Sequence, residues 1–384
     1  MRVKFGDVVV RANTKEDRFN TDKLYYVGGE HIETGEYLVT KRGLIAGSNI
    51  GPMFYFGFRK GQVLLASRSP DLKKAGMVTF DGICSEKTFV IETRDENVLL
   101  QSFLPIIVRS EAFWEYANNN QSGSVNHFIN WSTFSAYEFD LPSLEEQREL
   151  SEIVWAMVDA QRAYKALIAA SDELVKSQFI AEFGDPLNNT RGLPAHQLSE
   201  YITFLTSGSR GWAKFHSEEG EWFITIKNVK DCKISLDEVQ CITPPQNAEA
   251  DRTRLKEGDL LISITADLGR TGVVTKEIAD HGAYINQHLT CIRLNKTVLN
   301  PLYVAYFMES DAGKKQFFEK NLSSVKAGLN FDSIRTLRLL VPPMVDQERF
   351  ISFVRQLDKS KHSAQKALED LQATQKALIR KYLG

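Results

Sequence analysis

The stretch Leu141-Pro142-Ser143-Leu144-Glu145-Glu146-Gln147 decides how this chain is organised, because it recurs as Val341-Pro342-Pro343-Met344-Val345-Asp346-Gln347. The two copies start 200 residues apart, at 141 and 341. Other matches in the same order are Phe183-Gly184 with Leu383-Gly384, Phe128–Trp131 with Gly328–Phe331, and Lys60–Leu65 with Glu257–Ile262. A repeat of this kind predicts that one structural unit is present twice in the chain.

A long helix is predicted after each copy of the motif, because apolar residues recur there at alternating steps of three and four. The first predicted seam comprises Leu150, Ile153, Met157, Ala160, Tyr164, Leu167, Ser171 and Leu174. The second comprises Phe350, Val354, Leu357, Ala364, Leu368, Leu371, Leu378 and Tyr382. Each helix would run roughly 40 residues, or about 60 Å. Since a helix with one apolar seam needs a partner, we expect the two to pair as an antiparallel coiled coil.

The regions between the helices predict an α+β fold. Short β-branched segments such as Thr88–Ile91 and Asp259–Ile264 favour strands, whereas Leu302–Met308 favours a helix. We therefore expect two globular domains separated by two long helices. The predicted boundaries are 1–140, 141–184 for the central helix, 185–340, and 341–384 for the C-terminal helix.

Composition gives no sign of a specialised environment. The chain has 384 residues and a net charge of −2, so its total charge gives no indication of nucleic-acid binding. A protein whose total charge is close to zero can still have one basic face. The four cysteines form no CxxC pair, which predicts reduced thiols rather than a disulfide framework. We find no apolar signal core and no apolar run of membrane-spanning length, so we expect a cytoplasmic protein.

The plan of two variable regions, each followed by a long helix, resembles that of the specificity subunits of type I restriction–modification systems. The motifs at 141–147 and 341–347 are similar to the openings of that family's conserved helices, and Ser177–Gly184 is similar to their exit. Stretches that resemble recognition-domain subtypes are 206–212, 286–289 and 81–85. The resemblance covers essentially the whole chain.

The family implies that each variable region is a target-recognition domain that reads one half of a bipartite duplex DNA target. The helices would set the spacer between the halves and would dock two modification subunits, and a motor–nuclease subunit would join for restriction. S-adenosylmethionine is expected in the modification subunit, which methylates adenine. No cofactor, metal or catalytic residue is expected in this chain.

In the second variable region, one loop and one turn are candidate DNA contacts. Ser207, Gly208, Ser209, Arg210 and Trp212 form a loop in which glycine allows close approach, serine can bind phosphate and Arg210 can pair with guanine or phosphate. The alternative is an ordinary surface turn that Trp212 anchors.

Asn286, Gln287 and His288 offer amide and imidazole groups, and an amide can pair with adenine through two hydrogen bonds. The alternative is a strand that buries Gln287 with an internal hydrogen bond. Lys227 and Asn228 follow a strand-like segment and are further candidates, with a solvated strand end as the alternative.

In the first variable region, Arg59, Lys60, Arg68, Lys73 and Lys74 form the densest basic stretch. We interpret them as phosphate or base contacts, and a solvated charged face is the alternative.

Two other functions were weighed. An adenine methyltransferase should carry an Asn- or Asp-Pro-Pro-aromatic motif, and an ATPase should carry GxxxxGK[ST]; the sequence has neither. An enzyme with an unrecognised site would show turnover by the purified chain. A coiled-coil scaffold that binds only proteins would show no sequence-selective retention of DNA.

Overall fold

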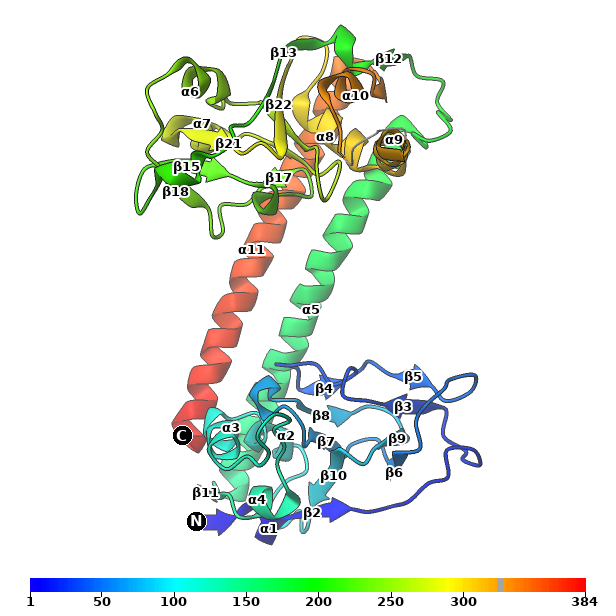
Figure 1. Cartoon of the computed structure of the whole chain (residues 1–384). Helices are drawn as coiled ribbons and strands as arrows, with labels where there is room; N and C mark the ends of the chain where they lie inside the picture. The colour runs from blue at the N-terminus through cyan, green and yellow to red at the C-terminus, as the bar shows by residue number, and fades with distance from the viewer. Residues whose placement is uncertain (323–327) are drawn as a thin grey trace. The chain divides into compact units, whose positions relative to one another are not determined.

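The computed structural model describes residues 1–322 and 328–384 and divides into two compact units. Unit 1 comprises Met1–Ile168 with Ser363–Gly384, and unit 2 comprises Ala169–His362. Helices α5 (Leu144–Phe183) and α11 (Met344–Leu383) each contribute one part to either unit (Figure 1). The predicted mixture of helices and strands is confirmed, and the finer division into four segments stays a prediction.

Unit 1 is built on two sheets. The first has the order β2-β10-β7-β8-β4, with strands Val9–Ala12, Thr88–Thr93, Val63–Ala66, Ala75–Val78 and Leu38–Val39. The second has the order β5-β3-β9-β6, with strands Gly43–Leu44, Tyr25–Val27, Gly82–Ser85 and Phe54–Phe58. Its other elements are β1 (Arg2–Lys4), α1 (Phe5–Val8), α2 (Leu104–Ile107), α3 (Glu111–Asn119), α4 (Trp131–Ser135) and β11 (Glu138–Asp140).

Unit 2 repeats this plan. Its first sheet has the order β13-β22-β19-β20, with strands Ile202–Ser207, Leu289–Leu294, Leu260–Ser263 and Thr271–Val273. Its second has the order β14-β18-β15-β21, with strands His216–Ser217, Gln240–Ile242, Glu221–Ile224 and Ala283–Ile285. The remaining elements are β12 (Ala195–Gln197), β16 (Val229–Lys230), β17 (Lys233–Ile234), α6 (Ala248–Thr253), α7 (Lys276–His281), α8 (Pro301–Glu309), α9 (Asp311–Leu322), α10 (Phe331–Arg335) and β23 (Arg338–Leu340).

The topology shows that the duplication extends through the variable regions. In both units the four corresponding strands of the first sheet are antiparallel, and the second sheet contains one parallel pair, β3 with β9 and β15 with β21. In both, a short strand at the start (β1, β12) pairs with the strand before the long helix (β11, β23). The repeat therefore covers a whole domain and its helix.

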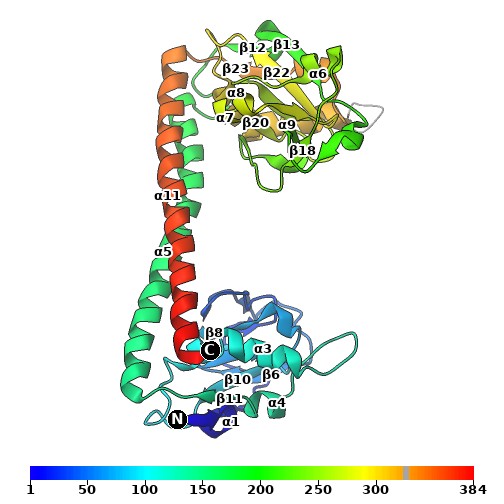
Figure 2. The same ribbon diagram turned by 90° about the vertical axis from the view of Figure 1, so that its left-hand side faces the viewer.

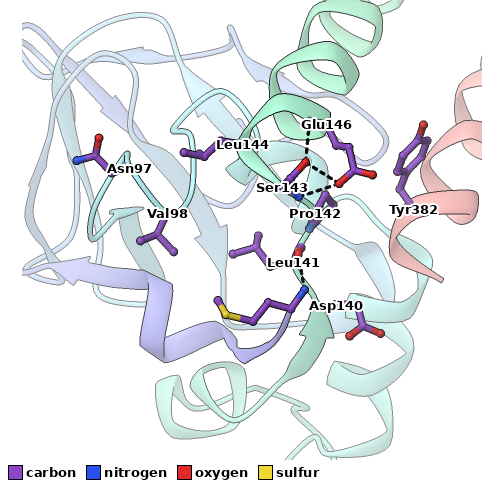
Figure 3. A pocket seen from close by; sticks show the side chains of 10 residues that line it. Asn97, Val98, Asp140, Leu141, Pro142, Ser143, Leu144, Glu146 and Tyr382 are labelled. Carbon is purple, nitrogen blue, oxygen red and sulfur yellow. Dashed lines mark hydrogen bonds between the residues drawn. The ribbon is translucent and has the colours of Figure 1, made fainter.

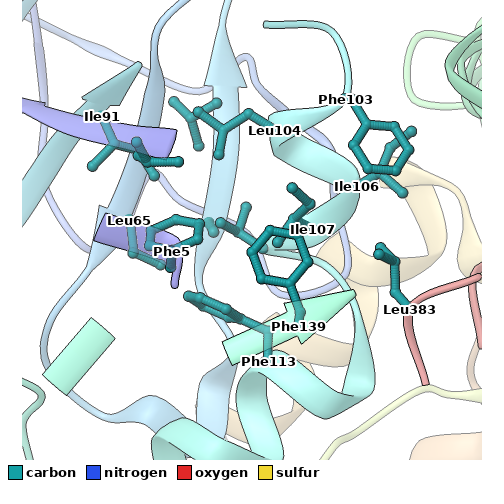
Figure 4. Close-up of a cluster of buried hydrophobic side chains, with 14 of the residues drawn as sticks. Phe5, Leu65, Ile91, Phe103, Leu104, Ile106, Ile107, Phe113, Phe139 and Leu383 are labelled. Atoms are coloured by element: carbon teal, nitrogen blue, oxygen red, sulfur yellow. The ribbon is translucent and has the colours of Figure 1, made fainter. Parts of the chain in front are cut away.

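The central strands explain where the cores lie. Val63 and Leu65 of β7 pack into one cluster, whereas Leu64 packs into a second cluster on the other face, because side chains alternate along a strand. Strand β19 divides in the same way between two clusters of unit 2. Figure 4 shows the first cluster of unit 1, where Phe5, Phe113 and Phe139 pack beside α2. A strand that is buried on both faces has an unbroken apolar sequence.

The long helices pack against each other within each unit. In unit 1, Leu150, Val154 and Val158 of α5 share a core with Ile379 and Leu383 of α11. The Gln161 Nε2 atom donates to Gln375 Oε1 over 3.0 Å in this contact, and both side chains are buried.

In unit 2, Phe179 and Phe183 of α5 contact the ring of Phe350, and Lys361 pairs with Asp172 at 2.5 Å. In both units, residues further along α5 meet residues earlier in α11, so each helix contact is antiparallel. Figure 2 shows the two helices from a second side.

The predicted seam of α11 falls on buried or half-buried residues, although Ile379 and Leu383 are buried where the half-buried Leu378 and Tyr382 were predicted. The predicted seam of α5 was wrong at three positions. Ile153, Leu167 and Leu174 are 47%, 52% and 47% exposed, respectively. The buried stripe lies one residue further along, at Val154, Ile168 (half-buried) and Val175. The reason is that α5 carries two apolar stripes side by side, and only one of them faces α11 within the units.

The glutamine that ends each copy of the motif joins the long helix to its domain. Gln147 is fully buried, and its Nε2 group donates to the carbonyl oxygens of Val98 at 3.0 Å and Pro142 at 2.9 Å. Its Oε1 atom accepts the N–H of Leu100 at 2.9 Å. Because the amide is buried and both its NH2 group and its oxygen have hydrogen-bond partners, it fixes the start of the helix against the loop before α2.

Gln347 makes the same three contacts in unit 2. Its Nε2 group donates to Val298 at 3.0 Å and Pro342 at 2.9 Å, and its Oε1 atom accepts the N–H of Asn300 at 2.9 Å. We call Gln147 and Gln347 the glutamine clamps.

The first prediction concerns these clamps. Gln147→Leu leaves two carbonyl groups and one N–H group buried without a partner, so we expect a loss of roughly 2–5 kcal/mol in the free energy of unfolding. Urea unfolding measures the loss, and hydrogen exchange at the Leu100 amide locates it. Arg148→Leu, one residue on and exposed, is the matched control. Equal stabilities for the two variants would contradict a structural role for the amide.

Candidate functional site

Three segments meet at one edge of unit 1, beyond the end of β7. The Ser67 N–H group donates to the carbonyl of Lys87 at 2.8 Å, and Ile129 N–H donates to the carbonyl of Ser67 at 2.8 Å. Ser69 N–H donates to the His127 carbonyl at 3.1 Å. Residues 67–69 therefore lie between the β9–β10 turn (86–87) and residues 127–129, and we call this group edge cluster 1.

Unit 2 has the same arrangement at the corresponding place, beyond the end of β19. Ile264 N–H donates to the carbonyl of His288 at 3.0 Å, and Leu329 N–H donates to the carbonyl of Ile264 at 2.8 Å. Residues 264–265, the β21–β22 turn (286–288) and residues 328–329 form edge cluster 2. The backbone of the two clusters matches, whereas the side chains on them differ.

The predicted loop 207–212 joins edge cluster 2. Gly208 N–H donates to the Leu289 carbonyl and Ser209 N–H donates to the Ile285 carbonyl, both at 3.1 Å. A Cβ atom on Gly208 would lie 2.1 Å from the carbonyl oxygens of Ile285 and Asn286, so the close approach requires glycine. The structure thus brings together the two segments that the sequence nominated separately, 207–210 and 286–288.

The half-buried side chains of edge cluster 2 are hydrogen-bonding groups. Thr265 Oγ1 lies 2.6 Å from His288 Nδ1, and Gln287 Nε2 lies 3.0 Å from His288 Nε2. Asn286 Oδ1 accepts the His288 N–H at 3.2 Å, and Arg210 is exposed beside this chain of contacts. Amide, imidazole, hydroxyl and guanidinium groups in this arrangement can read donor and acceptor patterns on a ligand.

Edge cluster 1 is more strongly charged. Arg68 is exposed and, in the part of the chain that the structure describes, makes no ion pair. Lys87 pairs with Glu86, which also accepts the Tyr55 hydroxyl at 3.0 Å. The Lys87 ammonium and the Tyr55 hydroxyl hold the pKa of the Glu86 carboxyl below its ordinary value. Two cations therefore flank a carboxylate that is ionised at neutral pH.

The basic stretch of unit 1 does not form one patch. Arg59 and Lys60 precede β7, at the opposite end of the strand from Arg68, and Arg59 lies 3.5 Å from Glu92. Lys73 and Lys74 follow the short turn 70–72, on the same side as Arg68. The Lys74 ammonium donates to the carbonyl of Gly29 at 2.5 Å.

Several of the predicted contact residues of unit 2 have structural partners. Trp212 is 3% exposed and packs against Phe223 and Tyr284. Asn228 is buried, and its Oδ1 atom accepts the N–H of Thr225 at 3.0 Å. Ser209 is also buried, whereas Lys227 is exposed. The buried side chains shape the loops, so our candidate contacts are the exposed and half-buried residues.

Sequence reasoning missed Lys87, Thr265 and the loop 121–128. The available signal was the repeat itself: aligning β7 with β19 and β9 with β21 places Lys87 opposite the nominated residue His288. The same alignment places Arg68 opposite Thr265.

A hollow of about 700 Å³ lies elsewhere in unit 1, at the start of α5 (Figure 3). It is lined by Met1, Asn97, Val98, Asp140, Leu141, Pro142, Ser143, Leu144, Glu146 and Tyr382. The Ser143 N–H and hydroxyl groups both donate to the Glu146 carboxylate at 2.8 Å, which caps the helix and lowers the pKa of Glu146. The Ser143 and Glu146 side chains of this hollow thus cap α5, and no basic side chain is among the lining residues.

The described residues show neither a cluster of metal ligands nor a membrane-spanning helix. Residues 1–322 and 328–384 contain no group of three His, Cys, Asp or Glu side chains that could hold a metal ion. None of the helices described has the length and apolar character needed to cross a membrane.

The chain is similar in sequence to known proteins. Residues 224–372 match the family model described as the type I restriction modification DNA specificity domain. The EcoKI specificity subunit of Escherichia coli K12 is 22% identical over 289 residues, and the StySPI specificity subunit of Salmonella potsdam is 22% identical over 298 residues. Each match covers 71% of this chain and 62% of the relative, so the matched region spans less than two thirds of those proteins.

Solved structures share the fold. A type I restriction–modification S subunit from M. genitalium has a TM-score of 0.64 at 12% identity, over 100% of this chain and 96% of that one. A chain from work on complex assembly and conformational transition of the type I R-M system has a TM-score of 0.56 at 18% identity, over 100% and 97%.

The second prediction tests the contact between loop 207–210 and the 286–288 turn. Gly208→Ala forces the two segments apart, at a cost of roughly 1–3 kcal/mol. We expect faster hydrogen exchange at the Ser209 amide and a lower unfolding midpoint. Gly29→Ala, where a Cβ atom meets nothing within 4 Å, is the control. If the Ser209 amide exchanges as slowly in both variants as in the unaltered chain, the close approach is refuted.

Proposed function

Because this chain belongs to the family of type I restriction–modification DNA specificity subunits, we propose that it selects the DNA sequence on which such an enzyme acts. Each unit reads one half of a bipartite duplex target. The chain itself is non-catalytic and binds no cofactor, and the S-adenosylmethionine is held by the modification subunit.

One observation carries this proposal: the two edge clusters share a backbone and differ in side chains. Arg68 and Lys87 occupy edge cluster 1, where Thr265 and His288 occupy edge cluster 2. Base edges in the major groove are distinguished by the pattern of donors and acceptors that faces them. Two different half-sites require a common scaffold that carries different DNA-contacting groups.

The long helices would fix the gap between the half-sites. We propose that α5 and α11 pair along their whole length as an antiparallel coiled coil. The antiparallel contacts inside each unit and the heptad spacing of the buried residues support this pairing. Two weak readers joined by a rigid element gain from effective concentration only when the gap in the DNA matches their separation.

The partners proposed are two modification subunits and motor–nuclease subunits. The second apolar stripe of α5 supports docking of a modification subunit, because Ile153 and Leu174 are exposed and lie three heptads apart. At the positions 200 residues on, α11 has the half-buried Phe353 and the polar Thr374. An exposed apolar stripe on a helix favours a helical partner.

A protein-binding scaffold without DNA recognition is the alternative. It accounts for the helices, but it gives no reason for two edge clusters that match in backbone and carry different hydrogen-bonding groups. We therefore favour the DNA-reading function.

The third prediction separates the two readers. Arg210→Ala or Gln287→Ala should weaken recognition of one half-site only, by roughly 1–3 kcal/mol if the side chain contacts a base. Binding of the methyltransferase complex to duplexes altered in either half measures this. Lys276→Ala, an exposed cation of unit 2 that lies away from the cluster, is the control. An equal loss for both halves, or no loss, would rule out these two residues as readers.

The fourth prediction tests the docking stripe. Ile153→Glu with Leu174→Glu should weaken assembly with the modification subunit by at least about tenfold, because two carboxylates would replace buried apolar contacts. Co-purification and light scattering measure the stoichiometry. Thr374→Glu, at the matching position of α11, should assemble normally. If the double variant assembles as well as this control, the stripe is not the docking face.

A further inference from the structure

The segment that runs from the end of α3 through α4 differs in composition from the rest of unit 1. Residues 116–137 contain no Asp, Glu, Lys or Arg, although charged residues make up 25% of the chain. Amide side chains are frequent in it: Asn118, Asn119, Asn120, Gln121, Asn126 and Asn130. A surface segment that only has to be soluble has no need to avoid charge. An amide side chain both donates and accepts hydrogen bonds, so it can pair with individual donor and acceptor groups of a ligand.

Part of this segment is a small hairpin that stands on edge cluster 1. The Ser122 N–H group donates to the Phe128 carbonyl and Phe128 N–H donates to the Ser122 carbonyl, both at 2.9 Å. Gly123 takes a left-handed φ of 94° at the turn. Val125 at the tip is 84% exposed, and Asn126 is exposed beside it. Figure 2 shows this loop reaching out between α3 and α4.

The hairpin has a rigid base and a free tip. Ile129 is buried at its foot, and the backbone of residues 127–129 is bonded to Ser67 and Ser69. Arg68 forms an isolated bridge with Phe128, and Arg68 is exposed at this edge of the unit. Because the base of the hairpin is fixed and Arg68 is exposed beside it, the tip can enter a groove of duplex DNA while Arg68 contacts a phosphate at its edge.

The polar capacity of the hairpin is not used inside the protein. Gln121 Oε1 and His127 Nδ1 have no hydrogen-bond partner among the described residues. The Asn126 amide also makes none within this part of the chain. Its neighbour Val125 adds an apolar group of the size that packs on a thymine methyl. The tip thus presents one amide and one aliphatic group side by side.

We propose that the hairpin 121–128 is the base-reading element of unit 1 and recognises an A·T pair in the major groove. Asn126 pairs with the N6 and N7 edge of adenine, Val125 contacts the thymine methyl, and Arg68 binds the adjacent phosphate. The inference rests on the proposed DNA-reading function, and it adds the residues and the base pair that the first half-site requires.

The test uses the assembled methyltransferase with Asn126→Ala, and Asn119→Ala as the matched control. Asn119 is an exposed amide of the same uncharged segment, at the end of α3 rather than at the tip. The readouts are the consensus of genomic adenine methylation and binding to duplexes with each base pair of one half-site replaced in turn. We expect Asn126→Ala to lose discrimination at one A·T position of one half-site, with at least about tenfold weaker binding to the cognate duplex.

Arg68→Ala should weaken binding to all duplexes similarly and lower the salt dependence by about one counterion. A bipartite consensus that Asn126→Ala and Asn119→Ala leave equally intact would overturn the hairpin assignment while keeping the proposed function. Absence of any bipartite consensus with the unaltered chain would instead overturn the proposed function. Because Val125 and Asn126 are exposed, an unchanged thermal midpoint confirms that each variant is folded.

Discussion

The structure depends on a buried amide that joins each long helix to the domain before it. Gln147 and Gln347 each satisfy two carbonyl groups and one N–H group in a site without access to water. A helix of 40 residues transmits a small change of angle at its start over its whole length. The clamp therefore fixes the start of each long helix against the domain before it. It also explains why the same motif stands at both positions of the repeat.

The two units show which parts of the fold are constrained and which are free. The order of four strands in the first sheet, the presence of one parallel pair in the second sheet, the edge-cluster backbone and the clamp are the same in both. What differs is the set of side chains on the edge: a guanidinium and an ammonium in unit 1, and an imidazole, an amide and a hydroxyl in unit 2. At the edge clusters, the side chains thus vary while the backbone hydrogen bonds are kept.

The sequence was sufficient for the fold class and for the long helices, because heptad spacing and the repeated motif are local signals. The side of α5 that faces α11 was misjudged by one residue, since two apolar stripes lie next to each other and the sequence does not say which is buried. The nominated segments 207–210 and 286–288 do meet, through backbone bonds that no residue pattern reveals. Arg59 and Arg68 are close in sequence but lie at opposite ends of a strand, so the basic stretch was not one surface. Trp212 and Asn228 carry polar groups that suit DNA, yet burial gives them structural roles.

We propose that one chain carries two different readers at a fixed separation. The most direct measurement is a genome-wide map of methylated adenines after co-expression of the chain with its modification subunit. We expect a single consensus made of two unlike halves with a gap of constant length. A continuous consensus, two identical halves or a gap of variable length would contradict it.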